Sequence, residues 1–359
     1  MPKLKDYYNT NEIANYYNEA VSNSIPMLGE TLFPYKKKLG LDLSYIKSGR
    51  GVPQVLKHSA FDVKAPLRDR IGFEKIQTSM PYFKEGFLIK EEDRQELLKL
   101  LDMNSGDQYI STIIANLYND SKELIDGAEL QFERMRMQLL CKGKIDIQSS
   151  KEGLEYKFAV PNYKVKADWS TKTTDIIADI IAIQDFVEER CGTRPTRALC
   201  TSKTMKYLVN NDVIKASVLG SKSNTKYVTT AMVKEYLQNE LDLTVQVYSK
   251  KYTDEDGKTT SLFDDDVFTM LPPHNLGSSW FGTTPEEADL LGSKAANVSI
   301  VKTGIALKTI DHADPVNVET IASFIGLPSF EKSNEVEIVQ VKTDAGALDN
   351  GAEADTIGA

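Results

Sequence analysis

The stretch LPPHNLGSSWFGTTPEEADLLG (Leu271–Gly292) is punctuated by proline and glycine and carries two adjacent aromatic residues, Trp280 and Phe281. A strand-like run precedes it at Leu262–Leu271, and a second strand-like run follows it at Ala296–Ile310. Proline and glycine in such numbers mark turns and loops. The stretch therefore predicts an irregular connection between two strands, set late in a chain of 359 residues.

A compact α/β region is predicted before this stretch, from about residue 173 onward. Isoleucines at helical spacing predict a helix that begins near Ile176 and ends near Gly192. A hairpin is predicted in which Leu243–Ser249 pairs with Leu262–Leu271 through the Asp256-Gly257 step. The other predicted elements are a buried strand and two helices, at Arg197–Thr201, Thr204–Asn210 and Thr230–Asn239.

Apolar residues recur at helical spacing over Asp107–Lys142, and Gly143 follows as a helix stop. A helix of this length is about three times longer than the average globular helix. Only one stripe of it is apolar, so we expect it to lie along a sheet or another subunit. Gly127 is the position at which this helix could break into two.

Residues 1–45 and 46–90 contain little regular core pattern, although Leu32 and Phe33 are too apolar for a solvated tail. Residues 46–90 predict a long two-stranded excursion, which would be marginal in water without a partner surface. Residues 335–342 predict a further strand. Residues 343–359 are small and acidic, which is typical of disorder.

The charge is distributed unevenly along the chain. Residues 1–90 hold 14 Lys and Arg against 9 Asp and Glu, whereas the remainder holds 29 against 43. A basic arm on an acidic body can pair with the body of a neighbouring copy, although the asymmetry can also be incidental. The net charge of −9 argues against general nucleic-acid binding. No apolar run approaches a membrane span, so we expect no membrane association.

No arrangement of residues predicts catalysis, a metal or a cofactor. Cys141, Cys191 and Cys200 lack metal-ligand spacing and are expected to be reduced and buried. His58, His274 and His312 lie far apart in the sequence. The run Gly49–Gln54 lacks the third glycine of a dinucleotide fingerprint, and Asp254–Gly257 lacks the rest of a calcium loop. We therefore predict that the chain is not an enzyme.

Several features coincide in one order: an apolar Leu32-Phe33-Pro34, a basic loop at Gly49–Gly86, the long helix, and the motif Leu271-Pro272-Pro273 through Gly282-Thr-Thr-Pro285-Glu286. Asp314-Pro315-Val316 after a strand adds support. In this order the chain resembles the major head proteins of tailed phages, the lambda head-protein E-like family with the Hong Kong phage capsid fold.

The resemblance implies an α+β capsid fold. Its expected parts are an N-terminal arm (1–45), an extended β-hairpin loop (46–90), a peripheral domain with a spine helix (91–172, helix 107–142), an α/β axial domain (173–295), returning strands (296–342) and a tail (343–359).

The resemblance also implies a subunit that assembles into pentamers and hexamers of an icosahedral head around double-stranded DNA. Expected partners are further copies of the chain, a separate scaffolding protein, a portal and, in some relatives, a decoration protein. The expected location is the virion, assembled in the host bacterial cytoplasm. Candidate contacts between subunits are Leu32, Phe33, Arg68, Arg70, Phe73, Lys75, Trp280 and Phe281.

Two alternatives remain at the level of the sequence. An encapsulin-like nanocompartment shell would share the fold but would enclose an enzyme. A soluble α/β enzyme with an accessory arm would form a small oligomer and carry a polar pocket. The α/β region alone does not separate these classes, because fold does not imply function.

Overall fold

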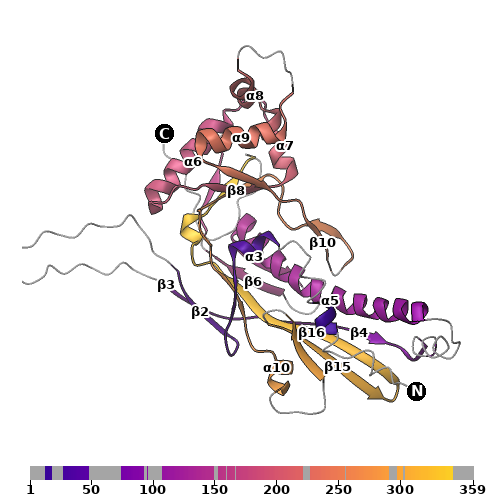
Figure 1. Cartoon of the computed structure of the whole chain (residues 1–359). Coiled ribbons are helices and arrows are strands. Elements are labelled where there is room, and N and C mark those ends of the chain that lie inside the picture. The colour runs from indigo at the N-terminus through magenta and orange to yellow at the C-terminus, as the bar shows by residue number, and fades with distance from the viewer. Residues whose placement is uncertain are drawn as a thin grey trace, which may run out of the picture. The chain divides into compact units, whose positions relative to one another are not determined.

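The chain forms two compact units, each built from three separate segments. The computed structural model describes residues 13–17, 27–47, 74–92, 95, 107–148, 153–158, 160–165, 167–220, 227–254, 256–290, 297–301 and 304–342. The first unit comprises Met1–Ser44, Gln77–Glu133 and Ser278–Ser329, and the second comprises Tyr45–Ile76, Arg134–Gly277 and Phe330–Ala359. Helices and sheets occur in both units, which confirms the predicted α+β class (Figure 1).

The first unit contains a sheet of six strands built around one long strand. The strands are β1 (Tyr35–Lys37), β4 (Tyr82–Ile89), β13 (Ser278–Phe281), β14 (Asn297–Val301), β15 (Ile305–Ala313) and β16 (Val316–Ser329). β16 pairs antiparallel with β15, β4 and β13, while β14 extends the sheet beyond β15. β1 lies parallel to β13. The 14-residue β16 therefore joins all the other strands into one layer (Figure 1).

A long helix, α5 (Asp107–Lys142), packs against one face of this sheet. The ring of Phe132 on α5 lies 4.6 Å from that of Phe281 on β13 and 5.7 Å from that of Phe324 on β16. Gly326 permits the close approach, because a Cβ there would lie 2.5 Å from Cε2 of Phe132. Offset and tilted aromatic pairs of this kind add specific stabilisation to the buried area.

The predicted helix over residues 107–142 is confirmed, and it continues through Gly127 without a break. Gly143 ends it in the left-handed conformation, with φ of 66° and its N–H donated to the carbonyl of Leu139 at 3.0 Å. Glycine adopts this conformation at no steric cost, which is why it commonly follows a helix. No helix in the described part of the chain is long and apolar enough to cross a membrane.

The remaining elements of the first unit are short. They include α3 (Leu28–Leu32) and α10 (Pro285–Leu290). β2 (Asp42–Lys47) pairs with β3 (Glu74–Ser79) as a separate two-stranded sheet, whose residues fall in both units. Residues 48–73, where most of the extended loop was predicted, lie outside the described residues.

The structure describes the last part of the region over which the long excursion is predicted, residues 46–90. Residues 82–89 form β4, which pairs with β16 along its whole length. The physical reason is the apolar alternation of β4, which places Phe83 and Ile89 on one face of the strand. Phe83 stacks on Phe324 with ring centroids 4.8 Å apart, and Ile89 is buried.

The second unit contains a five-stranded sheet in the order β7-β17-β12-β8-β9. Its strands are β7 (Asn162–Lys164), β8 (Arg197–Cys200), β9 (Thr244–Val247), β12 (Val267–Leu271) and β17 (Glu337–Gln340). β12 runs antiparallel to both of its neighbours, while β9 and β7 run parallel to β8 and β17.

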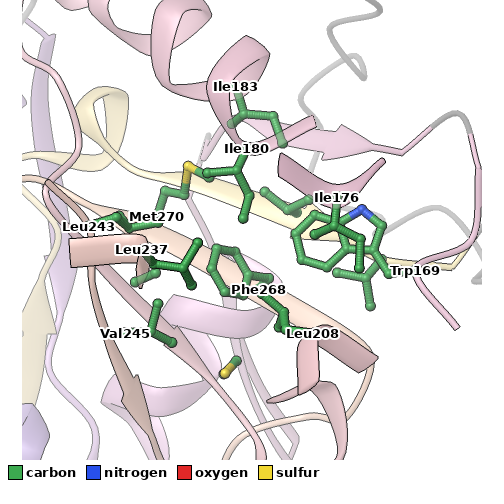
Figure 2. Close-up of a cluster of buried hydrophobic side chains, with 14 of the residues drawn as sticks. Trp169, Ile176, Ile180, Ile183, Leu208, Leu237, Leu243, Val245, Phe268 and Met270 are labelled. Carbon is green, nitrogen blue, oxygen red and sulfur yellow. The ribbon is translucent and has the colours of Figure 1, made fainter. Parts of the chain in front are cut away.

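Four helices cover one face of this sheet: α6 (Ile176–Cys191), α7 (Ser202–Asn210), α8 (Asp212–Leu219) and α9 (Thr230–Leu241). Figure 2 shows Ile176, Ile180 and Ile183 on successive turns of α6, above the ring of Phe268 on β12. Each fully buried side chain of this size contributes on the order of 1.5–3 kcal/mol relative to exposure. The opposite face meets the end of α5, where the hydroxyl of Thr269 donates to the carbonyl of Leu140 at 2.6 Å.

Two small hairpins and a 3₁₀ turn also belong to the described part of this unit. The hairpins are β5 (Lys144–Gln148) with β6 (Gly153–Lys157), and β10 (Lys251–Thr253) with β11 (Thr259–Ser261). The 3₁₀ turn is η1 (Ser333–Glu335).

The predicted pairing of Leu243–Ser249 with Leu262–Leu271 is wrong. β8 lies between β9 and β12, so these two strands do not touch in the sheet. The Asp256-Gly257 turn forms as expected, with φ of 77° at Gly257, but it closes the smaller hairpin β10–β11. A turn signal is local, whereas the choice of sheet neighbours depends on the distant strand β8.

The region predicted as one strand at residues 296–310 is instead a hairpin of β14 and β15. Gly304 precedes β15 with φ of 108°, and a Cβ there would lie 2.6 Å from Cβ of Phe281. The strands over residues 296–342, predicted as returning strands of a peripheral domain, fall in both units. β14, β15 and β16 belong to the first unit, whereas β17 lies in the sheet of the second.

Candidate functional site

The stretch 271–292 contributes to both units, and its first part is held by an arginine. The Arg197 guanidinium on β8 donates from Nε to the carbonyl of Pro272 at 2.8 Å and from Nη2 to the carbonyl of His274 at 2.6 Å. Burial lowers the pKa of Arg197, yet the group stays charged near neutral pH. Charge-assisted hydrogen bonds of this kind fix the path of the chain after β12.

The two adjacent aromatics of the stretch lie on opposite faces of β13. Phe281 is buried and its ring lies 5.4 Å from that of Tyr35 on β1. Trp280 is half-buried, and its Nε1 donates to Oγ of Ser329 at 3.2 Å. The ammonium of Lys36 lies 5.3 Å from the centre of the indole ring. The tryptophan thus combines an apolar body with polar and cationic neighbours.

Two carboxylates of α10 fasten this helix to the first-unit sheet. Glu286 is buried and accepts from Tyr82 Oη at 2.8 Å and from Ser323 Oγ at 2.9 Å, while Lys84 Nζ lies 3.3 Å away. Glu287 pairs with Lys37 on β1. The interactions therefore join α10 to three strands.

The protonation of this cluster follows from its contacts. Burial acts to raise the pKa of Glu286, but hydrogen bonds from its own backbone, Tyr82, Ser323 and Lys84 outweigh burial and hold the pKa below the usual value. Burial, with the hydrogen bond to Glu286, raises the pKa of Tyr82 to about 12. At neutral pH the carboxylate of Glu286 is therefore charged and the phenol of Tyr82 is neutral. The role of this cluster is to hold α10 against the sheet.

Three of the predicted contact residues are buried within the single chain. Leu32, Phe33 and Phe281 are at most 3% exposed. The hydroxyl of Ser279 donates to the carbonyl of Phe33 at 2.8 Å, so the segment after α3 lies on β13 of its own unit. The apolar character of this segment is therefore satisfied internally.

Of the other predicted contact residues, the structure describes some and not others. Trp280 keeps part of its side chain at the surface. Lys75 lies on β3, although the position of its side chain is outside the description. Arg68, Arg70 and Phe73 lie outside the described residues.

An exposed apolar turn joins β1 to β2 and was not predicted. Leu39 is 85% exposed and Leu41 is 50% exposed. Gly40 between them has φ of 87°, and its carbonyl lies 2.7 Å from where a Cβ of Gly282 would be. The sequence signal was the Leu-Gly-Leu that directly follows three lysines. Scattered surface leucines are ordinary, but two at one turn mark a candidate contact.

Among the described residues, no group of three or more His, Cys, Asp or Glu side chains is arranged to hold a metal ion. Burial raises the pKa of Cys141 and Cys200 to about 12, which leaves both thiols protonated and inert. Oδ1 of Asp254 accepts hydrogen bonds from the backbone N–H groups of Asp256 at 3.2 Å and of Lys258 at 2.8 Å. These bonds hold the β10–β11 turn.

Solved structures share this fold at low sequence identity. A capsid protein described as putative, from a prophage of E. coli CFT073, matches with a TM-score of 0.60 and 16% identity, covering 93% of this chain and 99% of its own. A phage-related protein from Bordetella bronchiseptica RB50 matches with a TM-score of 0.52 and 10% identity, covering 94% and 99%. The capsid subunit of cyanophage A-1(L) matches with a TM-score of 0.50 and 10% identity, covering 90% and 95%.

The family of the chain is shown by comparison of its sequence with models of protein families. No match to this chain is found among curated protein sequences. The family model for phage major capsid protein E matches residues 9–341, which is nearly the whole chain. Proteins of this family are structural rather than enzymatic. The chain therefore belongs to the phage major capsid protein E family and is a structural subunit of a phage capsid.

Proposed function

We propose that this subunit assembles into pentamers and hexamers that close into an icosahedral head around double-stranded DNA. The observation that carries the proposal is the family match over residues 9–341. A closed shell of many copies requires each subunit to use the same few surfaces repeatedly. The exposed turn at Leu39 and Leu41 and the half-buried Trp280 are surfaces that such contacts would cover.

The charge of the chain suits a container for DNA. Beyond residue 90 the chain holds 43 acidic against 29 basic residues. Acidic surfaces avoid the tight, counterion-releasing phosphate contacts that basic surfaces make. The packaged DNA would therefore be confined without sequence-specific binding.

Further partners belong to the same proposal. A separate scaffolding protein would direct assembly, a portal would occupy one vertex, and a decoration protein would bind the outside in those heads that have one. Assembly would take place in the cytoplasm of the bacterial host, and the product would be part of the virion.

The basic loop is proposed as one contact between neighbouring subunits. Arg68, Arg70 and Lys75 lie in the part of the chain that is net positive, and we propose that they pair with acidic residues of the adjacent copy. Phe73, between these basic residues, would add apolar contact. The proposal rests on the charge distribution of the sequence.

Negative-stain electron microscopy of the purified protein tests the function, with and without co-expression of a scaffolding protein. Shells, tubes, or rings of five or six subunits are expected. A uniform monomer or dimer under both conditions would overturn the proposal. Nuclease-resistant DNA in heads from infected cells would support a DNA container, whereas a co-purifying enzyme inside the shells would favour a nanocompartment.

A further inference from the structure

The outer face of α6 in the second unit is acidic and partly apolar. Residues 175–194 hold five acidic residues and two arginines. The inner face of the helix is buried in the core through Ile176, Ile180 and Ile183. The outer face exposes Ile181, which is 36% exposed, and the carboxylates of Asp185, Glu188 and Glu189.

The arginines near this face are already engaged. Arg190 turns to the sheet and donates to the buried carboxylate of Glu337 at 2.8 Å. Arg194 donates to Asp185 at 2.6 Å and to Glu188 at 2.7 Å. The hydrogen bonds of Arg190 and Arg194 go to other carboxylates than that of Glu189. The three exposed carboxylates of this face therefore outnumber the one arginine, Arg194, that pairs with them.

The outer face of α7 is basic. Residues 202–210 contain Lys203 and Lys206 and no acidic residue. Met205 and Leu208 point into the core, which leaves both lysines on the exposed side of the helix. Lys203 lies 2.9 Å from Asp266 and 3.9 Å from Asp265, which offset its charge, whereas Lys206 extends from the middle of the exposed face.

These two faces occupy different sides of one unit. α6 and α7 both cover the same face of the five-stranded sheet. Figure 1 shows α6 at the left and α7 at the right of this helix layer, with α9 between them. The unit therefore presents a negative, partly apolar face at α6 and the exposed ammonium of Lys206 at α7.

We propose that the outer face of α6 in one copy docks against the outer face of α7 in the next copy of the chain. A contact between two different faces is head-to-tail, and repeated rotation closes it into a ring. Opposite charges on the two faces select the partner and its orientation, while Ile181 contributes apolar area that is exposed in the single chain. This inference rests on the proposed assembly into rings.

Single charge reversals test the contact without removing a hydrogen bond described within the chain. Glu189→Lys or Lys206→Glu places like charges across the proposed contact, and each is expected to lower the assembled fraction by about tenfold or more. The double variant E189K/K206E restores opposite charges and is expected to assemble like the wild type. Sedimentation velocity measures the assembled fraction, and circular dichroism checks that each variant is folded.

Mixing the two single variants makes the test sharper. In a head-to-tail ring they can alternate, so that every contact again joins a lysine to a glutamate. An even ring permits this alternation and an odd ring does not. The mixture is therefore expected to form hexamers and no pentamers, and a mixture that stays unassembled would contradict the proposal.

The control is Glu235→Lys, an exposed charge reversal on α9, which is expected to assemble normally. If the wild type assembles and both single variants do too, the α6–α7 contact is wrong and the proposed function stands. Folded single variants that fail, together with a double variant that also fails, would likewise reject this pairing. A wild type that assembles under no condition would instead reject the proposed function itself.

Discussion

At the scale of single residues, the contact between Gly326 and Phe132 shows how closely α5 approaches β16. A Cβ at Gly326 would lie 2.5 Å from Phe132 Cε2 and 2.9 Å from the carbonyl of Trp280. We expect Gly326→Ala to lower the free energy of unfolding by about 1–3 kcal/mol, because an overpacked core must shift to admit a methyl group. Urea denaturation of the unassembled subunit, followed by tryptophan fluorescence, measures the change.

The matched control is Gly127→Ala in the exposed middle of α5. Nothing lies within 4 Å of the added Cβ, and the backbone is already helical. Alanine favours a helix interior over glycine by up to about 1 kcal/mol, so this variant should be more stable than the wild type. Equal stability of G326A and the wild type would show that the helix and strand are not packed as described.

Glu286 predicts a dependence of stability on pH. Its pKa in the folded protein is lowered from 4.5, because hydrogen bonds to its charged form outweigh burial. Between this lowered pKa and about pH 4.5, the folded state therefore binds fewer protons than the unfolded state. The stabilisation is therefore complete above about pH 4.5 and is lost as the pH falls through the folded pKa.

Glu286→Gln isolates this contribution. We expect it to cost about 1–3 kcal/mol at neutral pH, the range for hydrogen bonds that involve a charged group. The difference from the wild type should begin to shrink as the pH falls below about 4.5 and should be smallest below the lowered pKa of the folded protein, where the wild-type carboxylate is protonated. Denaturation curves at several pH values measure it, with the exposed Glu85→Gln on β4 as control. A difference that does not change with pH would argue against a charged Glu286.

At the scale of elements, β17 holds the second-unit sheet together from near the C-terminal end of the described chain. It lies between β12 and β7, and its residues are buried. We expect a chain that ends after Glu331 to lose the cooperative unfolding of this unit, because two strand pairings and their apolar residues are removed. A chain that ends after Lys342 should keep it. Thermal melts by circular dichroism compare the two, and equal melting of both chains would contradict the prediction.

Sequence alone predicted α5 at the same residues as the structure, 107–142. The reason is that helical periodicity and the Gly143 stop are local signals that one segment carries by itself. Strand pairing is different. β9 and β12 were paired because a good turn lies between them, yet β8, from more than 40 residues earlier in the chain than β9, separates them. Neither the β9 sequence nor the β12 sequence alone indicates which strand lies next to it in the sheet.

The candidate contacts show the same limit. Leu32 and Phe33 were correctly identified as residues that need a surface to pack on, but sequence could not say whether that surface was their own or a neighbour's. In the structure both side chains are buried within the single chain, and the carbonyl of Phe33 accepts a hydrogen bond from the hydroxyl of Ser279 on β13. The exposed leucines of the β1–β2 turn were missed because exposure depends on the whole fold, and leucine is one of the residue types most often buried.

At the scale of the whole molecule, the separation of charge along the chain leads to the last prediction. Residues 1–90 are net positive and the remainder is net negative, so basic residues of one copy can pair with acidic residues of another. The triple variant Arg68→Glu, Arg70→Glu and Lys75→Glu replaces attraction by repulsion at the proposed loop contact. We expect it to remain folded by circular dichroism and to form few or no shells by sedimentation and electron microscopy. A control with the exposed Lys251 and Lys258 reversed to Glu changes the net charge in the same direction on the β10–β11 hairpin and should still assemble. If the triple variant forms shells as readily as the wild type, the basic loop does not make the contact and the charge separation has no role in assembly.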